Sequence, residues 1–130
     1  MKVTKIRQYC CIYLLIVLVI VPAVACGRTP NEVTEINIPH TIEEERELQK
    51  SVDNGHQPWR LNPVDVAHQS VITNADKTVK YDKCSLITQK DEEAIVQCGS
   101  AKKNFKVHLK RFFGKKSIWT ATQIEIIKNE

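Results

Sequence analysis

Residues 84–98 read CSLITQKDEEAIVQC, and this stretch carries the clearest fold signal in the sequence. Two runs rich in strand-forming residues, 85–88 and 94–97, flank the polar turn 90–93, a pattern typical of a β-hairpin. A register centred on that turn places Cys84 directly opposite Cys98, at the distance of a cross-strand pair. We therefore expect two antiparallel strands whose open end brings two cysteines together.

The residues that follow the hairpin extend the sheet. Phe105, Val107 and Leu109 alternate with polar residues, as in a strand with one buried and one wet face. The segment 117–127, with Trp119 as its largest side chain, is expected to close the sheet. A further short strand is expected at 78–81.

The residues before the hairpin predict two helices. Thr41 and Glu44 match a capping box, so a first helix should run to about Asp53. Its apolar stripe, formed by Ile42, Leu48 and Val52, is thin, which is typical of a helix that rests loosely on a domain.

The second helix has the stronger signal. Asn62 stands at the N-cap and Pro63 at the first helical position. Its helical face should pack on the sheet; that face comprises Val64, Ala67, Val71 and Ala75. Trp59 is expected to cover the end of the core. The predicted fold is α+β, with one or two N-terminal helices on a curved antiparallel meander of three to four strands.

Residues 1–25 have the parts of a secretion signal. Three basic residues precede the apolar run 12–21, and Pro22 and Ala23-Val24-Ala25 then lead to Cys26. This ending resembles the lipobox of bacterial lipoproteins, although Ala23 stands where leucine is usual. The resemblance implies that Cys26 receives a diacylglyceryl group, that the chain is cut before it, and that the protein is held at the outer face of a membrane by this lipid.

Two other interpretations of the leader remain open. The stretch 8–27 has no charged residue and is long enough to span a bilayer uncleaved. A signal peptide cut without lipidation is the other. All three place the rest of the chain outside the cytoplasm. We divide the sequence into a signal peptide (1–25), a lipidated tether (26–40) and a small α+β extracytoplasmic domain (41–130). The apolar residues Val33, Ile36 and Ile38 would allow part of the tether to lie against that domain as an extended segment.

The net charge and the cysteine content limit the classes of partner and of chemistry that the sequence supports. Removing Lys2, Lys5 and Arg7 lowers the 19 basic residues to 16, against 15 acidic residues. A nearly neutral protein is a poor candidate for binding nucleic acid, which requires neutralising many phosphates. Export to an oxidising compartment favours a disulfide between Cys84 and Cys98, with two buried free thiols as the alternative.

No catalytic or metal-binding motif is present in the sequence. The four histidines show no ligand spacing, and the chain has neither a Gly-x-Ser-x-Gly elbow nor a glycine-rich phosphate loop. A disulfide would also remove the thiolate that cysteine catalysis needs. We expect a non-enzymatic protein without a cofactor.

The stretch 102–116 is the most distinctive feature of charge, because it has seven basic residues and no acidic one. We treat them as a possible contact surface for an anionic envelope polymer, anionic lipid or an envelope protein. The alternative is a solvated strand face. The residues are Lys102, Lys103, Lys106, Lys110, Arg111, Lys115 and Lys116.

Residues 59–67 and 117–121 resemble segments of small uncharacterised lipoproteins of Gram-positive bacteria. The order of helix and curved sheet also resembles cystatin-like and nuclear-transport-factor-like domains. These resemblances imply a fold and a location but no catalytic residue. The expected function is a lipid-anchored interaction module of the cell envelope; the alternative is a small-ligand-binding or hydrolytic domain with a pocket in the concave face of the sheet.

Overall fold

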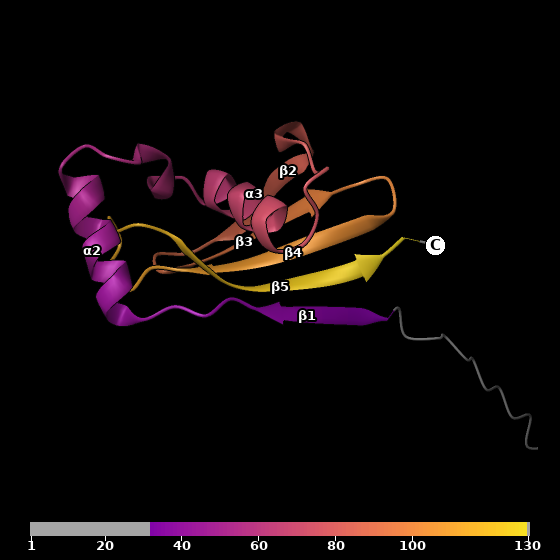
Figure 1. Cartoon of the computed structure of the whole chain (residues 1–130), viewed down its shortest axis with the longest axis horizontal. Helices are drawn as coiled ribbons and strands as arrows, with labels where there is room; N and C mark the ends of the chain where they lie inside the picture. The colour runs from indigo at the N-terminus through magenta and orange to yellow at the C-terminus, as the bar shows by residue number, and fades with distance from the viewer. Residues whose placement is uncertain (1–31, 130) are drawn as a thin grey trace, which may run out of the picture.

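The computed structural model describes residues 32–129, which form five strands, two α-helices and two short 3-10 helices (Figure 1). The sheet has the order β1-β5-β4-β3-β2, and every neighbouring pair is antiparallel. The bounds of the elements in chain order are β1 Val33–Asn37, α2 Ile42–Asp53, η2 Pro58–Leu61, α3 Pro63–Asn74, η3 Tyr81–Lys83, β2 Cys84–Gln89, β3 Glu93–Gly99, β4 Lys103–Lys110 and β5 Thr120–Lys128.

The α+β class and the meander from β2 to β5 are confirmed, but the number of strands is not. The sequence predicted a tether at residues 26–40 and a sheet of three or four strands. Val33–Asn37 instead form β1, the fifth strand, which pairs with β5 from Val33 opposite Ile127 to Asn37 opposite Gln123. The sheet therefore begins before residue 41, and a strand precedes both helices.

Two other strand predictions were wrong in detail. Residues 78–81 do not form a strand, because Asp76 accepts hydrogen bonds from the backbone N–H and the hydroxyl of Thr78 and holds a turn there. The last strand begins at Thr120 and not at Ser117. Its backbone is preceded by a turn in which the N–H of Ser117 donates to the carbonyl oxygen of Gly114.

The hairpin register is confirmed at its open end. Cys84 pairs with Cys98, Ser85 with Gln97 and Leu86 with Val96. A bulge between Leu86 and Thr88 then shifts the pairing by one residue. Bulges of this kind twist an edge strand and interrupt its ladder, which hinders pairing with another chain.

Helix α3 packs across one face of the sheet and contacts β2, β3, β4 and β5. Asn62 caps it by accepting a hydrogen bond from the N–H of Val64, as the sequence predicted. Ala67 and Val71 are fully buried in the core beneath it. The sheet side chains that fill this face are also buried and include Val96, Phe105, Val107, Leu109 and Ile124, and Trp119, just before β5, belongs to the same core.

Helix α2 lies beyond the end of the sheet and not across its face (Figure 1). The predicted capping box between Thr41 and Glu44 is present. The helix ends in a Schellman turn, in which His56 N–H donates to the carbonyl of Ser51 and Gly55, at φ +85°, donates to that of Val52. Only Glu45 and Val52 of this helix are buried.

The opposite face of the sheet is covered by no helix within the described part of the chain. Ile95, Lys106, His108 and Glu125 lie on that face. Between residues 32 and 129, no helix combines the length and the apolar content needed to cross a membrane.

Candidate functional site

A hollow on the described surface lies between α2 and α3, at the end of the sheet where β5 begins. We call it the α2–α3 groove; it encloses about 770 Å³. Ile38 and Pro39, which connect β1 to α2, close one side of it, and Thr120 and Ala121 of β5 form part of its floor. Two α-helices, the 3-10 helix η2, one linker and one strand therefore build the site.

The groove combines an apolar lining with an acidic rim. Leu48 and Trp59 are partly buried, and Val66 and Ala121 are buried, so its walls are mostly hydrocarbon. Four glutamates from the first two turns of α2 also line it, and three of them are exposed to solvent. The four are Glu43, Glu44, Glu45 and Glu47, and the polar residues opposite them on α3 are Gln69, Ser70, Thr73 and Asn74.

Glu45 is the buried member of the four, with 4% of its surface exposed. The hydroxyl of Thr120 donates a short hydrogen bond to its Oε2 atom. Arg60 lies near it: burial lowers the pKa of the Arg60 guanidinium, while the Glu45 carboxylate opposes that shift. Because a buried carboxylate is costly without such partners, this contact fixes Glu45 as part of the groove floor.

Arg60 is held in place by three further contacts. Its guanidinium lies 4.7 Å from the centre of the Trp59 ring, and its Nε–H donates to Oε1 of Gln57 over 2.8 Å. Its backbone carbonyl accepts a hydrogen bond from Trp119 N–H at 2.8 Å. The groove therefore contains one ordered cation near its floor and an excess of carboxylates at its rim.

The position of α2, and with it the width of the groove, depends on two long-range hydrogen bonds, the one between Thr120 and Glu45 and a second one to Gln49. The buried backbone N–H of Ile118 donates to Oε1 of Gln49 at 2.8 Å, across 69 residues of sequence. A buried N–H without an acceptor is costly, so Gln49 ties the middle of α2 to the segment before β5.

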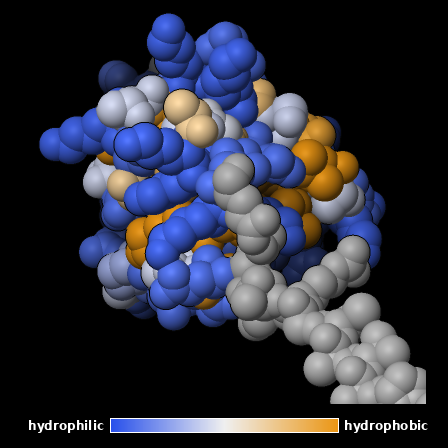
Figure 2. Space-filling view, turned by 90° about the vertical axis from the view of Figure 1, so that its right-hand side faces the viewer, coloured by the Kyte–Doolittle hydropathy of each residue, from blue (hydrophilic) through white to orange (hydrophobic). Residues whose placement is uncertain are grey.

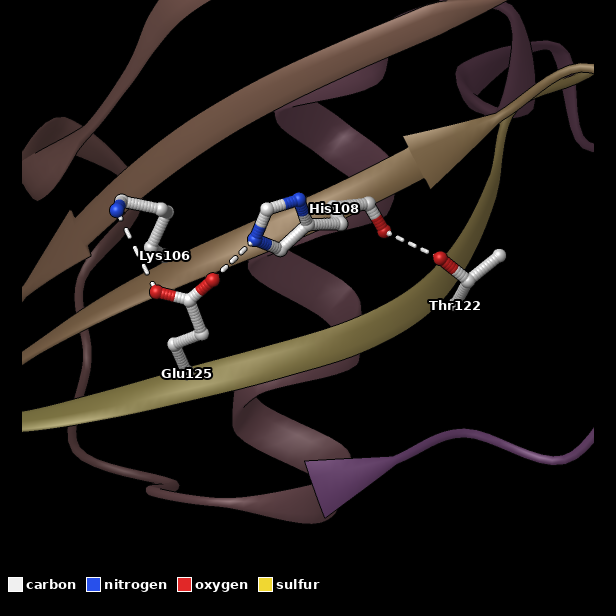
Figure 3. Close-up of polar contacts among 4 residues, drawn as sticks. All are labelled: Lys106, His108, Thr122 and Glu125. Carbon is white, nitrogen blue, oxygen red and sulfur yellow. Dashed lines mark hydrogen bonds and ion pairs between the residues drawn. The ribbon is translucent and has the colours of Figure 1, made fainter. Parts of the chain in front are cut away.

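A second polar cluster lies on the uncovered face of the sheet (Figure 3). The His108 Nε2 and Glu125 Oε1 atoms are 2.6 Å apart, and Lys106 Nζ lies 3.4 Å from Glu125 Oε2. The hydrogen bond to His108, assisted by Lys106 and opposed by burial, lowers the pKa of Glu125 below its ordinary value. The carbonyl of His108 also accepts a hydrogen bond from Thr122.

This cluster joins the neighbouring strands β4 and β5. The nearest hollow on that face is about 170 Å³ and is lined by His108 together with Thr88, Lys90 and Ile95. Its size is below that of ordinary ligand sites. We interpret the cluster as a cross-strand contact that stabilises the sheet.

The predicted disulfide is present: Cys84 and Cys98 are bonded, with their Cα atoms 4.0 Å apart. Neither sulfur is a thiolate in this form, so neither can act as a nucleophile. Cys26, the predicted lipidation site, lies outside the described residues. Within residues 32–129, no group of three or more metal-ligating side chains is brought together.

The two ends of the basic stretch 102–116 lie apart in the structure. Strand β4 separates its two ends by about 23 Å, at about 3.3 Å per residue. Lys102 and Lys103 lie at the turn between β3 and β4, and Lys115 and Lys116 lie in the loop before β5. The structure therefore places these two lysine pairs at opposite ends of the sheet, with Lys106 and Lys110 between them on β4.

Four cations of this stretch lie close to a carboxylate or to an aromatic ring. Lys106 contacts Glu125, Lys110 lies 3.9 Å from Glu93, and Lys115 contacts Asp91 at 2.6 Å. Arg111 lies 4.1 Å from the centre of the buried Trp119 ring. Burial lowers the pKa of the Arg111 guanidinium, and Asp91 opposes that shift.

Comparisons of this chain with protein-family models, with curated proteins and with solved structures found no match. The site is therefore interpreted from its own geometry.

The residues that build the groove were not predicted as a site. Of the four glutamates, only Glu44 entered the sequence analysis, as a member of the capping box of a loosely attached helix. The one available signal was the placement of a carboxylate on the same side of α2 as Leu48 and Val52, which is the side that faces the domain.

Proposed function

We propose that this protein is a lipid-anchored, non-enzymatic binding module at the extracytoplasmic face of a bacterial membrane, and that the α2–α3 groove is its binding site. The groove carries the proposal, because its apolar walls and acidic rim suit a segment that presents both hydrocarbon and positive charge. The anchor is supported by the sequence of residues 1–26.

The partner is a basic, partly apolar peptide segment of an envelope protein. Leu48, Trp59 and Val66 offer surface for one or two apolar side chains, and burial of apolar surface supplies the affinity. Glu43 and Glu47 are exposed at the rim, so they would contribute mainly to the rate of association and to the choice of partner.

A small amphiphilic cation is the second candidate. The groove volume of about 770 Å³ lies within the range of small-molecule sites. This candidate replaces the concave-face pocket considered from the sequence, because the sheet face under α3 is filled by side chains. Hydrolysis has less support, since Glu45 is already bonded to Thr120 and lies beside Arg60.

The test uses the full chain in detergent micelles and two fluorescent peptides with identical leucine and tryptophan content. One peptide carries lysines and the other carries glutamates at the same positions. Fluorescence anisotropy should detect binding of the basic peptide, with an affinity that falls as salt rises.

Leu48→Arg should abolish this binding, and the double variant Glu43→Gln/Glu47→Gln should weaken it by about three- to tenfold at low salt. The matched control is Glu92→Gln/Glu93→Gln in the β2–β3 turn, which removes the same charge away from the groove. Equal binding of both peptides, or an equal loss in the control, would contradict the proposal. Binding of a cationic detergent-like amphiphile without either peptide would favour the small-ligand candidate.

A further inference from the structure

The end of the sheet opposite the groove is the end at which the described chain begins. Glu32 precedes β1, and β1 runs from this end to α2 (Figure 1). Because β5 runs antiparallel to β1 and starts at the groove, the groove and Glu32 lie at opposite ends of these strands. We call the end at Glu32 the entry end.

Six lysines gather at the entry end from three separate segments. Lys128 ends β5 and pairs with Lys103 at the start of β4. The loop between α3 and β2 lies beside the β3–β4 turn, since Lys80 and Lys83 line one hollow with Gly99–Ala101. The six are Lys77, Lys80, Lys83, Lys102, Lys103 and Lys128.

These lysines exceed the carboxylates near them. The described carboxylates of the entry end are Glu32, Asp76 and Asp82, three against six. Glu32 contacts Lys128 at 2.6 Å, and Asp82 lies 3.9 Å from Lys83. Within residues 32–129, no carboxylate lies within ion-pair distance of Lys77, Lys80 or Lys102. Figure 2 views the molecule from this end, and mostly hydrophilic residues face the viewer.

The length of chain before Glu32 limits how far this end can be from a membrane. If the protein is anchored at Cys26, five residues lie between the anchor and Glu32, and the six Cα–Cα steps reach about 20 Å at full extension. The same limit holds if residues 8–27 instead remain as a membrane span. The entry end is therefore the only part of the described chain that the anchor must keep close to the lipid headgroups.

We propose that the entry end, through its six lysines, rests on anionic lipid headgroups and so directs the α2–α3 groove away from the membrane. This inference rests on the proposed anchor. The attraction of a lysine to an anionic surface falls off within a Debye length of about 8 Å. Lysines at the groove end lie about 25 Å farther along the strands and would not feel it.

Lysine-selective acetylation read by mass spectrometry tests the orientation. The full chain is reconstituted in vesicles of phosphatidylcholine alone or mixed with phosphatidylglycerol. In the anionic vesicles, Lys77, Lys80, Lys83, Lys102 and Lys128 should be acetylated on the order of fivefold more slowly than in the neutral vesicles. Lys50, Lys90 and Lys116 at the groove end are internal controls whose rates should not change.

A charge-matched pair of variants sharpens the result. The set Lys77→Gln, Lys80→Gln, Lys83→Gln and Lys102→Gln should abolish the protection of Lys128. The set Lys50→Gln, Lys90→Gln, Lys115→Gln and Lys116→Gln removes the same charge at the groove end and should leave that protection unchanged. Equal protection at both ends, or in both kinds of vesicle, would overturn the inference.

The anchor is tested separately by washing the same vesicles with alkaline carbonate. Release of the protein would contradict the anchor, whereas retention with unprotected entry-end lysines would contradict only the orientation.

Discussion

The two helices are of equal length but are attached to the domain by different kinds of contact. Helix α3 lies across four strands and buries Val66, Ala67 and Val71 in the core. Helix α2 buries only Glu45 and Val52 and is joined to the strand region through the side chains of Glu45 and Gln49. Helix α3 is attached mainly by buried apolar side chains, and helix α2 mainly by side-chain hydrogen bonds.

This difference explains where the groove is. A helix that packs by apolar burial approaches the sheet until the space between them is filled. A helix held by two polar side chains stops at hydrogen-bonding distance, and the space between α2 and α3 remains open. We therefore expect α3 to determine global stability and α2 to determine the shape of the site.

The largest expected effect is in the core beneath α3. Val71→Ala removes two methyl groups from a side chain with no exposed surface and should lower the free energy of unfolding by about 2–3 kcal/mol. Urea denaturation of the full chain, followed by tryptophan fluorescence, measures this loss. Thr73→Ala on the exposed side of the same helix is the control and should change stability by less than about 0.5 kcal/mol. A small effect of Val71→Ala would mean that α3 does not determine stability.

A smaller effect is expected from the attachment of α2. Gln49→Ala leaves the buried N–H of Ile118 without its acceptor and should cost about 1–2 kcal/mol. Amide hydrogen exchange should show faster exchange in α2 with little change in α3, because α2 opens locally. Gln69→Ala on α3, whose amide contacts only Thr73, is the matched control. Equal acceleration in both helices would contradict the difference between them.

The smallest effect is expected on the uncovered face, where polar contacts leave no cavity when removed. Glu125→Gln should cost about 0.5–1 kcal/mol near pH 7. Since the pKa of Glu125 is lowered in the folded protein, its contribution is present above the ordinary carboxyl pKa and is lost as pH falls through the lowered value. Urea midpoints of the two proteins should therefore converge as the pH falls below the ordinary carboxyl pKa, and a difference that stays constant as the pH is lowered would exclude the proposed titration.

Local patterns in the sequence predicted the elements that depend on neighbouring residues. Thr41 and Asn62 marked the starts of both helices, and the turn at 90–93 placed Cys84 opposite Cys98. These signals need only a few residues, because capping and hairpin pairing are short-range interactions.

The features that were missed depend on distant partners. β1 is short and lies between prolines in sequence, and its pairing with β5 joins residues about ninety positions apart. The groove requires Gln49 to meet Ile118, before β5, and Glu45 to meet Thr120, the first residue of β5, and no local pattern reveals either contact. The seven basic residues between 102 and 116 are close in sequence, but β4 lies between the first and the last of them and separates them in space.

The pairing of the first strand with the last has a consequence for how the chain folds. The hairpins from β2 to β5 and their covering helix close short loops and can form early, whereas β1 must wait until β5 is in place. A chain that folds as it emerges therefore completes its sheet only after β5 has emerged. Until then, the edge of β5 would be open to strands from other molecules.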